Sequence, residues 1–553
     1  MRYSTWIAQA LLLIVAGMPW DLSAQAHITQ QAYLKAHNAP NARNFGNSVA
    51  ASGDTVVVGA SREPGNQSYE GAAYVFVRNG TSWTQQAQLK ASNRGQDGFS
   101  IVAISGDTIV VGAPEEDSNA AGVNGNQADN SMDDAGAAYV FVRQGTTWTQ
   151  QAYLKASNPG VDNFFGSSVA VEGETIVVGA AGEDSNATGV NGNQANNSAA
   201  WAGAAYVFVR NGTTWTQQAY LKASNTTVDD LFGSVAISGD TIVVGAQTED
   251  SDAFGSGAAY VFFREGTLWT QQAYLKASNP GTRLPGEYGG LDGDSFGVAA
   301  AISGDTIVVG AIGEDSGATG INGDQTNNTR FNSGAAYIFV REGANWSQQA
   351  YLKASANAPN DAFGTQFGAD VAVSGDTVVI GGPFENGGAT GVNGNEGNQA
   401  ARGAGAVWVF GRSGAAWNQR AYLKASNTGI VNAFGISVAL SGDTLVVGAH
   451  KEDSSTSGVN STPNNNQFSE YGAAYVFTGM LLPPPALAIQ ALHGNVHLSW
   501  PLSATDWLLE HSETMASPAA WAPIPAPYES DATGFFHTVP VPAGSGFFRL
   551  VRP

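Results

Sequence analysis

A stretch of 16 residues recurs in seven similar copies along the chain and sets what this sequence can fold into. The clearest copy, Phe165 to Ala180, reads F-G-S-S-V-A-V-E-G-E-T-I-V-V-G-A. Two runs rich in β-branched residues flank a Gly-acid turn, which predicts a β-hairpin. The copies recur about every 65 residues, a period that indicates a repeat architecture. The turns of units one to seven are Gly53-Asp54, Gly106-Asp107, Gly173-Glu174, Gly239-Asp240, Gly304-Asp305, Gly375-Asp376 and Gly442-Asp443.

Two further strands complete each unit. In unit three they are G-A-A-Y-V-F-V-R, from Gly203, and W-T-Q-Q-A-Y-L-K-A, from Trp215. A four-stranded unit with one long loop is typical of a propeller blade. We expect the fourth strand to alternate, with one polar face exposed, and its tryptophan to pack in the core or between blades. Its repeated lysine is expected to be an outer-strand charge that protects the sheet edge. The lysines are Lys35, Lys90, Lys155, Lys222, Lys276, Lys353 and Lys424.

The two ends of the repeat region complement each other. Unit seven has no fourth strand, because the chain leaves it through Thr478-Gly479 into prolines. The missing copy lies ahead of unit one, as Thr29 to Ala36. A ring whose last blade takes its outer strand from the N-terminus explains both facts. The sequence therefore predicts an all-β fold in which residues 27–479 form a seven-bladed β-propeller closed by N-terminal strand exchange.

Three segments flank or follow this region. Residues 1–26 have the charged start, apolar core and Ala-x-Ala end of a signal peptide, which predicts a secreted or cell-surface protein. That apolar run is too short for a membrane span, and we expect none elsewhere. Residues 480–486 read as a Pro-rich linker. Residues 487–553 are expected to form a small all-β, β-sandwich-like C-terminal domain.

Composition limits the classes of function. There is no cysteine, so disulfides, thiolate zinc sites and a Cys nucleophile are excluded. The formal net charge of −22 disfavours a nucleic-acid partner. We find neither H-E-x-x-H nor G-x-S-x-G, and no other catalytic set, so we expect a protein that is not an enzyme. The propeller is expected to be monomeric.

The loop between the second and third strands differs most among units. In four units it contains a G-[VI]-N-G segment, whereas units one and four have short loops without it. Long loops on a rigid scaffold commonly carry binding functions. We therefore take one asparagine per long loop as a candidate ligand-binding residue: Asn124, Asn191, Asn322 and Asn393.

The Phe-Gly pair followed about a dozen residues later by Gly-Ala resembles the FG-GAP repeat of integrin α subunits and of secreted bacterial proteins. The resemblance covers residues 27–479 and implies a β-propeller with an adhesion or ligand-binding role. Integrin-like repeats carry a calcium loop of D-x-D/N-x-D-G type between FG and GAP. In this chain the position of that calcium loop is taken by a short turn, such as Ser238-Gly239-Asp240-Thr241 in unit four. One carboxylate cannot supply the six to eight oxygens that calcium takes, so the family's calcium site does not carry over.

A calcium site could instead lie in the loop between the second and third strands of a unit. One aspartate per loop follows a glutamate and precedes a serine, with further Asn and Asp oxygens downstream. In the alternative, these side chains cap turns without any metal. Both alternatives stay open. The candidate metal ligands are Asp117, Asp184, Asp250, Asp315 and Asp453.

The function expected from these observations is that of a secreted, non-enzymatic binding or adhesion protein. Its propeller loops would bind an extracellular protein or glycan at a surface. The alternatives are a propeller hydrolase or lyase acting on polysaccharide, and a purely structural envelope or matrix protein. A special site needs asymmetry among near-identical units. The strong asymmetries are the insertion Thr282 to Asp294 and the short loop of unit four, so a site, if present, is expected there.

Overall fold

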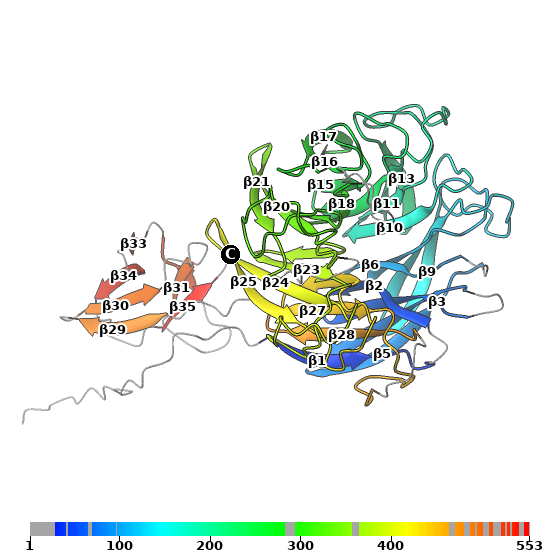
Figure 1. Cartoon of the computed structure of the whole chain (residues 1–553). Coiled ribbons are helices and arrows are strands. Elements are labelled where there is room, and N and C mark those ends of the chain that lie inside the picture. Colours follow the sequence, from blue (N-terminus) through cyan, green and yellow to red (C-terminus); the bar gives the residue numbers. More distant parts are fainter. Residues whose placement is uncertain are drawn as a thin grey trace, which may run out of the picture.

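In the computed structural model every regular element among the described residues is a β-strand, and no described helix could span a membrane (Figure 1). The signal peptide predicted for residues 1–26 and residues 481–486 of the predicted linker lie outside the described residues. The structure describes residues 28–39, 43–64, 69–93, 95, 97–281, 293–356, 364–463 and 470–480, and in the C-terminal part 487–492, 495–500, 508–512, 521–525, 528–530, 534–540 and 547–551.

Each repeat unit forms a four-stranded antiparallel sheet, in chain order for units one to six. Units one and two comprise β2 (Arg43–Ser52), β3 (Thr55–Arg62), β4 (Ala72–Asn79), β5 (Ser82–Leu89), β6 (Ile101–Ser105), β7 (Thr108–Ala113), β8 (Ala137–Gln144) and β9 (Thr147–Leu154). Units three and four comprise β10 (Phe165–Glu172), β11 (Thr175–Ala180), β12 (Ala204–Asn211), β13 (Thr214–Leu221), β14 (Phe232–Ser238), β15 (Thr241–Ala246), β16 (Ala258–Glu265) and β17 (Leu268–Leu275).

The remaining units follow the same order up to the last sheet. Units five and six comprise β18 (Phe296–Ser303), β19 (Thr306–Ala311), β20 (Ala335–Glu342), β21 (Asn345–Leu352), β22 (Val371–Ser374), β23 (Thr377–Gly382), β24 (Ala406–Ser413) and β25 (Ala416–Leu423). Unit seven comprises β26 (Ser437–Ser441), β27 (Thr444–Ala449) and β28 (Ala473–Thr478). Its fourth strand is β1 (Thr29–Leu34), which pairs antiparallel with β28.

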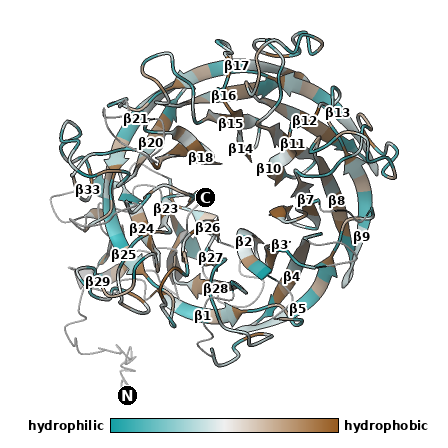
Figure 2. Cartoon of the chain, turned by 45° about the vertical axis from the view of Figure 1, so that its right-hand side comes forward, coloured by the Kyte–Doolittle hydropathy of each residue, from teal (hydrophilic) through white to brown (hydrophobic). Residues whose placement is uncertain are grey.

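The sheets stand around a central space, as in a propeller (Figure 2). The first strands of the units lie toward the centre, and β5, β9, β13 and β17 lie at the rim. Neighbouring sheets bury apolar clusters between them. In unit three, Phe165 packs edge-on against Tyr206, with ring centroids 5.3 Å apart, and Tyr206 packs on Tyr220 at 5.2 Å. The contact of the Phe recurs in the other sheets, with Trp408 in place of the tyrosine in unit six. In unit one Tyr74 pairs with Gln88 instead of a second tyrosine.

A glycine in the second strand sets how closely two sheets approach. At Gly179 a Cβ atom would lie 1.9 Å from the carbonyl oxygen of Gly233, in the first strand of the next unit. Any larger residue would therefore push two backbones apart. Gly448 meets the carbonyl oxygen of Gly46 in the same way, at 2.0 Å, which places unit seven against unit one. The other members of this set are Gly59, Gly112, Gly245, Gly310 and Gly381.

The N-terminal strand lies in the sheet of unit seven. Tyr33 pairs with Tyr475, and their ring centroids are 5.3 Å apart. Gln31 accepts a hydrogen bond of 2.7 Å from the indole Nε1 of Trp83 in unit one. Corresponding glutamines accept from the tryptophans of the next unit at Gln86, Gln151, Gln218, Gln272 and Gln349. β1 thus makes both the pairing and the cross-unit contact of a fourth strand, and the predicted packing of the tryptophans between units is confirmed.

The simple alternation expected for the fourth strand is wrong. A bulge interrupts its register, because Phe76 pairs with Gln85 while Val75 pairs with Ala87. Gln86 is the extra residue, and a bulge re-aims the side chains that follow it. In unit three, where the long loop bridges to the strand end through Val190 and Leu221, the residues Ala219, Tyr220 and Leu221 are all buried rather than half exposed.

The described residues of the C-terminal part form seven short strands in two sheets, set beside the repeated sheets in Figure 1. One sheet has the order β29-β30-β34-β33 and the other β32-β31-β35. Leu498, Trp500 and Leu509 form its buried centre. The strands are β29 (Ala488–Leu492), β30 (Asn495–Trp500), β31 (Leu508–Ser512), β32 (Ala522–Pro523), β33 (Glu529–Ser530), β34 (Phe535–Pro540) and β35 (Phe547–Val551).

If β1 is a full strand of the sheet of unit seven, truncating its buried Tyr33 should destabilise the protein as much as truncating the equivalent tyrosine inside another unit. We expect Tyr33→Ala to lower the free energy of unfolding by about 3–5 kcal/mol, as for other buried aromatic truncations. Tyr153→Ala in unit two is the matched control. Urea denaturation measures both free energies of unfolding. A loss below about 1 kcal/mol for Tyr33→Ala, with a full loss for Tyr153→Ala, would show that β1 is not part of the folded sheet.

Candidate functional site

The repeated lysine of the fourth strand does not protect an edge, and that expectation is wrong. In five units its side chain is buried and forms an ion pair with a buried glutamate of the same sheet. The glutamate follows the second strand in a tight turn: Glu183 donates its backbone N–H to Ala180. The pairs, with N–O distances, are Lys35–Glu452 (2.8 Å), Lys155–Glu116 (2.8 Å), Lys222–Glu183 (2.9 Å), Lys353–Glu314 (2.5 Å) and Lys424–Glu385 (2.6 Å).

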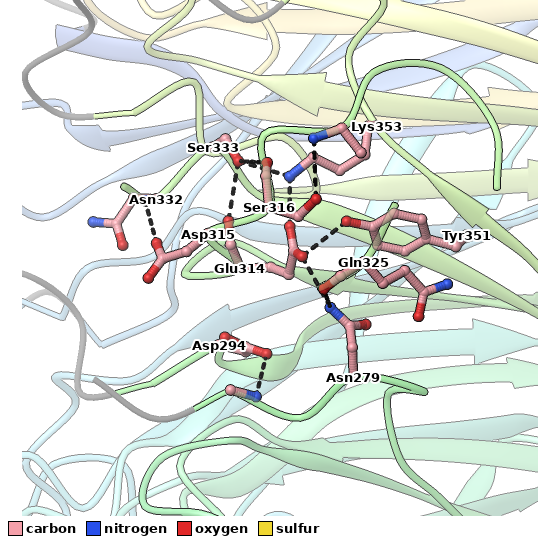
Figure 3. A network of polar contacts seen from close by, with 12 residues as sticks. Asn279, Asp294, Glu314, Asp315, Ser316, Gln325, Asn332, Ser333, Tyr351 and Lys353 are labelled. Carbon is pink, nitrogen blue, oxygen red and sulfur yellow. Dashed lines mark hydrogen bonds and ion pairs between the residues drawn. The ribbon is translucent and has the colours of Figure 1, made fainter. Parts of the chain in front are cut away.

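Figure 3 shows the network around one such pair, in unit five. Glu314 Oε1 accepts hydrogen bonds from the hydroxyl of Tyr351 (2.8 Å) and from Nδ2 of Asn279 (3.0 Å). Lys353 Nζ also donates to the Ser333 hydroxyl at 2.6 Å. Burial lowers the pKa of the Lys353 ammonium, while the Glu314 carboxylate acts against this shift. A charged pair so deep is tolerated only because its remaining polar atoms have partners.

The asparagine of this network comes from the preceding unit. Asn279 follows the fourth strand of unit four, donates to Glu314 of unit five and accepts from the hydroxyl of Tyr337 at 2.7 Å. Equivalent asparagines link the other neighbouring units at Asn38, Asn93, Asn158, Asn225 and Asn427. Unit six departs from the pattern at both positions. Trp408 replaces the tyrosine of the third strand, and Ala356 replaces the asparagine. The indole Nε1 of Trp408 donates to the Ser355 hydroxyl instead.

The asparagines predicted to bind a ligand clamp their loops to the fourth strand. In unit two, Asn124 donates its backbone N–H to the carbonyl of Tyr153 at 2.8 Å. Its Oδ1 accepts the backbone N–H of Tyr153 at 2.9 Å. Its φ of +57°, a left-handed value, lets both bonds form at once. The same clamp occurs at Asn191, Asn322, Asn393 and Asn460. These oxygens are therefore engaged inside the protein, and a ligand-binding role for them stays a prediction.

The predicted metal-ligand aspartates also have internal partners. Asp117 Oδ1 accepts the backbone N–H of Asp134 at 3.0 Å, and Asp184 accepts that of Trp201 at 2.9 Å. Asp315 and Asp453 cap Asn332 and Glu470 in the same way. Asp250, in the short loop of unit four, is exposed. Among the residues that the structure describes, no three acidic or His side chains gather as a metal site would need. The geometry matches turn capping, and calcium binding in these loops stays a prediction.

The Gly-acid turns, where the related calcium loop would lie, do not fit the metal. Their single acidic side chain is engaged by an arginine from the third strand: Arg264 Nη2 lies 2.7 Å from Asp240 Oδ1. That guanidinium also stacks over the Trp269 ring, 5.0 Å from its centroid. One carboxylate that is already paired with a cation falls short of the six to eight oxygen ligands that calcium takes. The same pair occurs at Asp54, Asp107, Glu174, Asp305 and Asp376.

Unit four is open where the long loops cover other units. Its fourth strand carries the same residues, but Tyr274 is 39 % exposed, whereas Tyr153, Tyr220 and Tyr351 are 0 % exposed. Phe254 in the short loop is 62 % exposed. Lys276 still pairs with Glu249 at 2.8 Å, and its Nζ lies 3.8 Å from the exposed Asp252. We call the group Asn225, Glu249, Ser251, Asp252, Phe254, Tyr274 and Lys276 the unit-four opening.

The unit-four opening lies where the sequence predicted asymmetry, and the short loop was the signal. The sequence did not reveal which residues the loop would expose, because Tyr274 is identical to its buried counterparts. Of the insertion named with it, residues 282–292 lie outside the described part of the chain. Unit one is the second short-loop unit. There Gln88 replaces the tyrosine, and Tyr69 is exposed.

A fold of repeated four-stranded antiparallel sheets defines a protein of the propeller type. Its repeats also identify the family. The family model of the FG-GAP repeat matches residues 28–76, 83–141, 148–208, 215–262, 269–339 and 417–477, and the chain belongs to this family. No curated protein matches the chain. The matched segments leave out residues 340–416, which include the aberrant Trp408 of unit six.

The buried pair should be far more costly to break than an exposed one. Glu183→Gln leaves Lys222 buried without its counter-charge, so we expect a loss of about 3–5 kcal/mol in the free energy of unfolding. Glu470→Gln is the control, since its pair with Arg62 is about half exposed and contributes about 0–1 kcal/mol. Equal losses in the free energy of unfolding for the two variants, measured by urea denaturation, would show that the Lys222–Glu183 pair contributes no more than an exposed ion pair.

A second prediction concerns Asp294, which is buried beside this network and accepts the backbone N–H of Gly281 at 2.7 Å. Burial, with the charges of Glu314 and Asp315 adding to it, raises its pKa from 3.8 to about 7. The folded state then holds a proton that the unfolded chain releases, so stability falls as pH rises from about 4 to about 7. Asp294→Asn should therefore stabilise the protein by about 2–4 kcal/mol at pH 8 and have little effect at pH 4.

The matched control for Asp294→Asn is the reverse change in unit seven. Asn432 occupies the equivalent buried position, two residues before the Phe of the repeat. Asn432→Asp should destabilise at pH 8 and not at pH 4, by the same linkage. Thermal or urea unfolding at the two pH values measures both variants. A pH-independent effect of Asp294→Asn would show that the carboxyl is not protonated in the folded state at neutral pH.

Proposed function

We propose that this chain is a secreted, non-enzymatic binding protein that engages an extracellular protein or glycan through the loop side of its propeller. Its membership of the FG-GAP family supports a binding role, because propellers present loops on a rigid scaffold. The observation that carries the proposal is the unit-four opening. It combines an exposed aromatic ring, a half-exposed tyrosine and an exposed carboxylate at one place, whereas long loops cover the ends of the fourth strands in five other units.

We further propose that the scaffold is a seven-bladed propeller closed by the exchange of β1. Support comes from the pairing of β1 with β28 and from the approach of Gly448 to Gly46. The Ser441 hydroxyl also accepts the backbone N–H of Gly53 at 3.0 Å, as Ser52 accepts that of Gly106 in the next unit. A closed ring holds the loops of all units rigidly, which suits recognition of a fixed surface.

A binding role is favoured over catalysis by how the ionisable groups are used. The buried glutamates and lysines of the repeats neutralise each other, and the turn carboxylates neutralise arginines. Groups committed in this way are poor general acids or bases, since their protons and lone pairs already have partners. Binding through exposed aromatic and polar side chains needs no such free group.

The experiment is a binding screen of the secreted chain on glycan and extracellular-protein arrays, with two variants. Phe254→Ala should weaken binding about tenfold, as expected for an exposed anchor that becomes buried at an interface. Leu268→Ala is the matched control, because Leu268 is equally exposed, at 63 %, but lies in the turn that begins β17. Equal losses of affinity in both variants would show that the unit-four opening is not part of the binding interface. Turnover of a polysaccharide by the wild type would overturn the non-enzymatic role.

A further inference from the structure

Five units of this chain show how the end of a fourth strand is completed by a short extended segment. In unit two the segment Gly122-Val123-Asn124 lies along the strand end, and Val123 bridges to Leu154. The Lys155 backbone N–H donates to Gly122 at 2.8 Å, and Asn124 makes its two bonds to Tyr153. The same bridges occur at Val190, Ile321, Val392 and Val459. The chain thus contains five examples of one Gly-(Val/Ile)-Asn segment bound to one strand edge.

Unit four presents the same strand end without that segment. β17 ends in Ala273-Tyr274-Leu275, followed by Lys276, as in the completed units. Tyr260 pairs with Tyr274 in the register in which Tyr139 pairs with Tyr153, so the backbone of Tyr274 faces the outer edge as that of Tyr153 does. Within the described residues, no loop of unit four returns to this edge. An exposed strand edge is a template on which another chain can pair.

We propose that the open end of β17 binds an extended segment of a partner protein that carries Gly-(Val/Ile)-Asn. The partner's backbone forms the bonds that Gly122 and Asn124 form in unit two, and its Asn side chain accepts the Tyr274 N–H. The apolar middle residue packs beside Leu275, as Val123 lies beside Leu154. This inference rests on the proposed binding function and names the partner class at the unit-four opening. It is strand addition, with affinity from the main chain and specificity from alternate side chains.

A peptide fits this place better than a sugar because the polar side chains beneath the edge already have partners. Glu249 Oε1 accepts from Asn225 Nδ2 (2.7 Å) and from the Tyr274 hydroxyl (3.0 Å), and Oε2 accepts from Lys276 Nζ. What the edge still offers is a row of backbone groups at strand spacing. The exposed ring of Phe254 and the half-exposed Tyr274 then border the segment and become buried with it.

The test uses the full chain and a fluorescent peptide with the sequence of residues 121–126, Ala-Gly-Val-Asn-Gly-Asn, followed by anisotropy. We expect saturable binding, about fivefold weaker for a peptide with Ala in place of its first Asn, since one hydrogen bond is lost. A graft variant, with residues 186–202 of unit three in place of residues 252–256, should cover β17 and abolish binding. No binding, equal binding of the two peptides, or binding retained by the graft would overturn the proposal.

The place of binding is tested by disulfide trapping, because the chain has no cysteine of its own. A peptide whose terminal Cys is activated as a mixed disulfide with an aromatic thiol is used, so that the protein thiolate attacks it and the aromatic thiol leaves. It should react at least about tenfold faster with Phe254→Cys than with Leu268→Cys, two sites of equal exposure, if it docks at the strand end. Equal rates would contradict docking there. A dimer that forms without peptide and is lost in the graft would assign the edge to a second copy instead. If an array ligand is lost in Phe254→Ala while the peptide never binds, this inference fails and the proposed function stands.

Discussion

The packing of the repeated sheets depends on a close approach between the backbones of neighbouring units. A glycine in each second strand lies against a carbonyl oxygen in or just before the next unit's first strand, where a Cβ atom would come within 1.9–2.1 Å. No side chain can occupy this contact, so the two strands meet at a fixed distance. The aromatic residues that flank them then pack alike in successive sheets, with Trp408 in place of the tyrosine in unit six. Because each unit repeats the contact, an error in one would displace all that follow.

A second shared element is the buried lysine–glutamate pair. Its glutamate and lysine come from one unit, but the asparagine that satisfies the glutamate comes from the unit before. In these units the buried glutamate depends on the neighbouring unit for part of its hydrogen bonding, which couples adjacent sheets. Unit six is the exception, because Ala356 stands in place of the asparagine. The long loops complete this arrangement by covering the strand end above each pair. Unit four keeps the pair but lacks the cover, so a place that is structural elsewhere becomes accessible there.

Several features of the candidate site were not predictable from the local pattern. Lys222 is identical in type to a surface lysine, and only Glu183, 39 residues earlier in the chain, makes its burial tolerable. Asn191 looks like a loop residue free to bind a ligand, yet its left-handed backbone turns its oxygen onto Tyr220. The bulge at Gln86 breaks the alternation of the strand, because its side chain must reach the indole of Trp148 in the next unit. Each of these outcomes depends on a partner distant in sequence.

The sequence by itself determined the all-β class, the repeating four-stranded unit and the family, because hairpin turns and strand periodicity are local properties that recur in copies. It also located the asymmetry of unit four, since a missing loop is visible as missing residues. The tertiary structure alone decided which polar side chains are hydrogen-bonded or ion-paired inside the protein and which face solvent. Burial is a property of neighbours, and in this fold the decisive neighbours lie tens of residues away or in another unit.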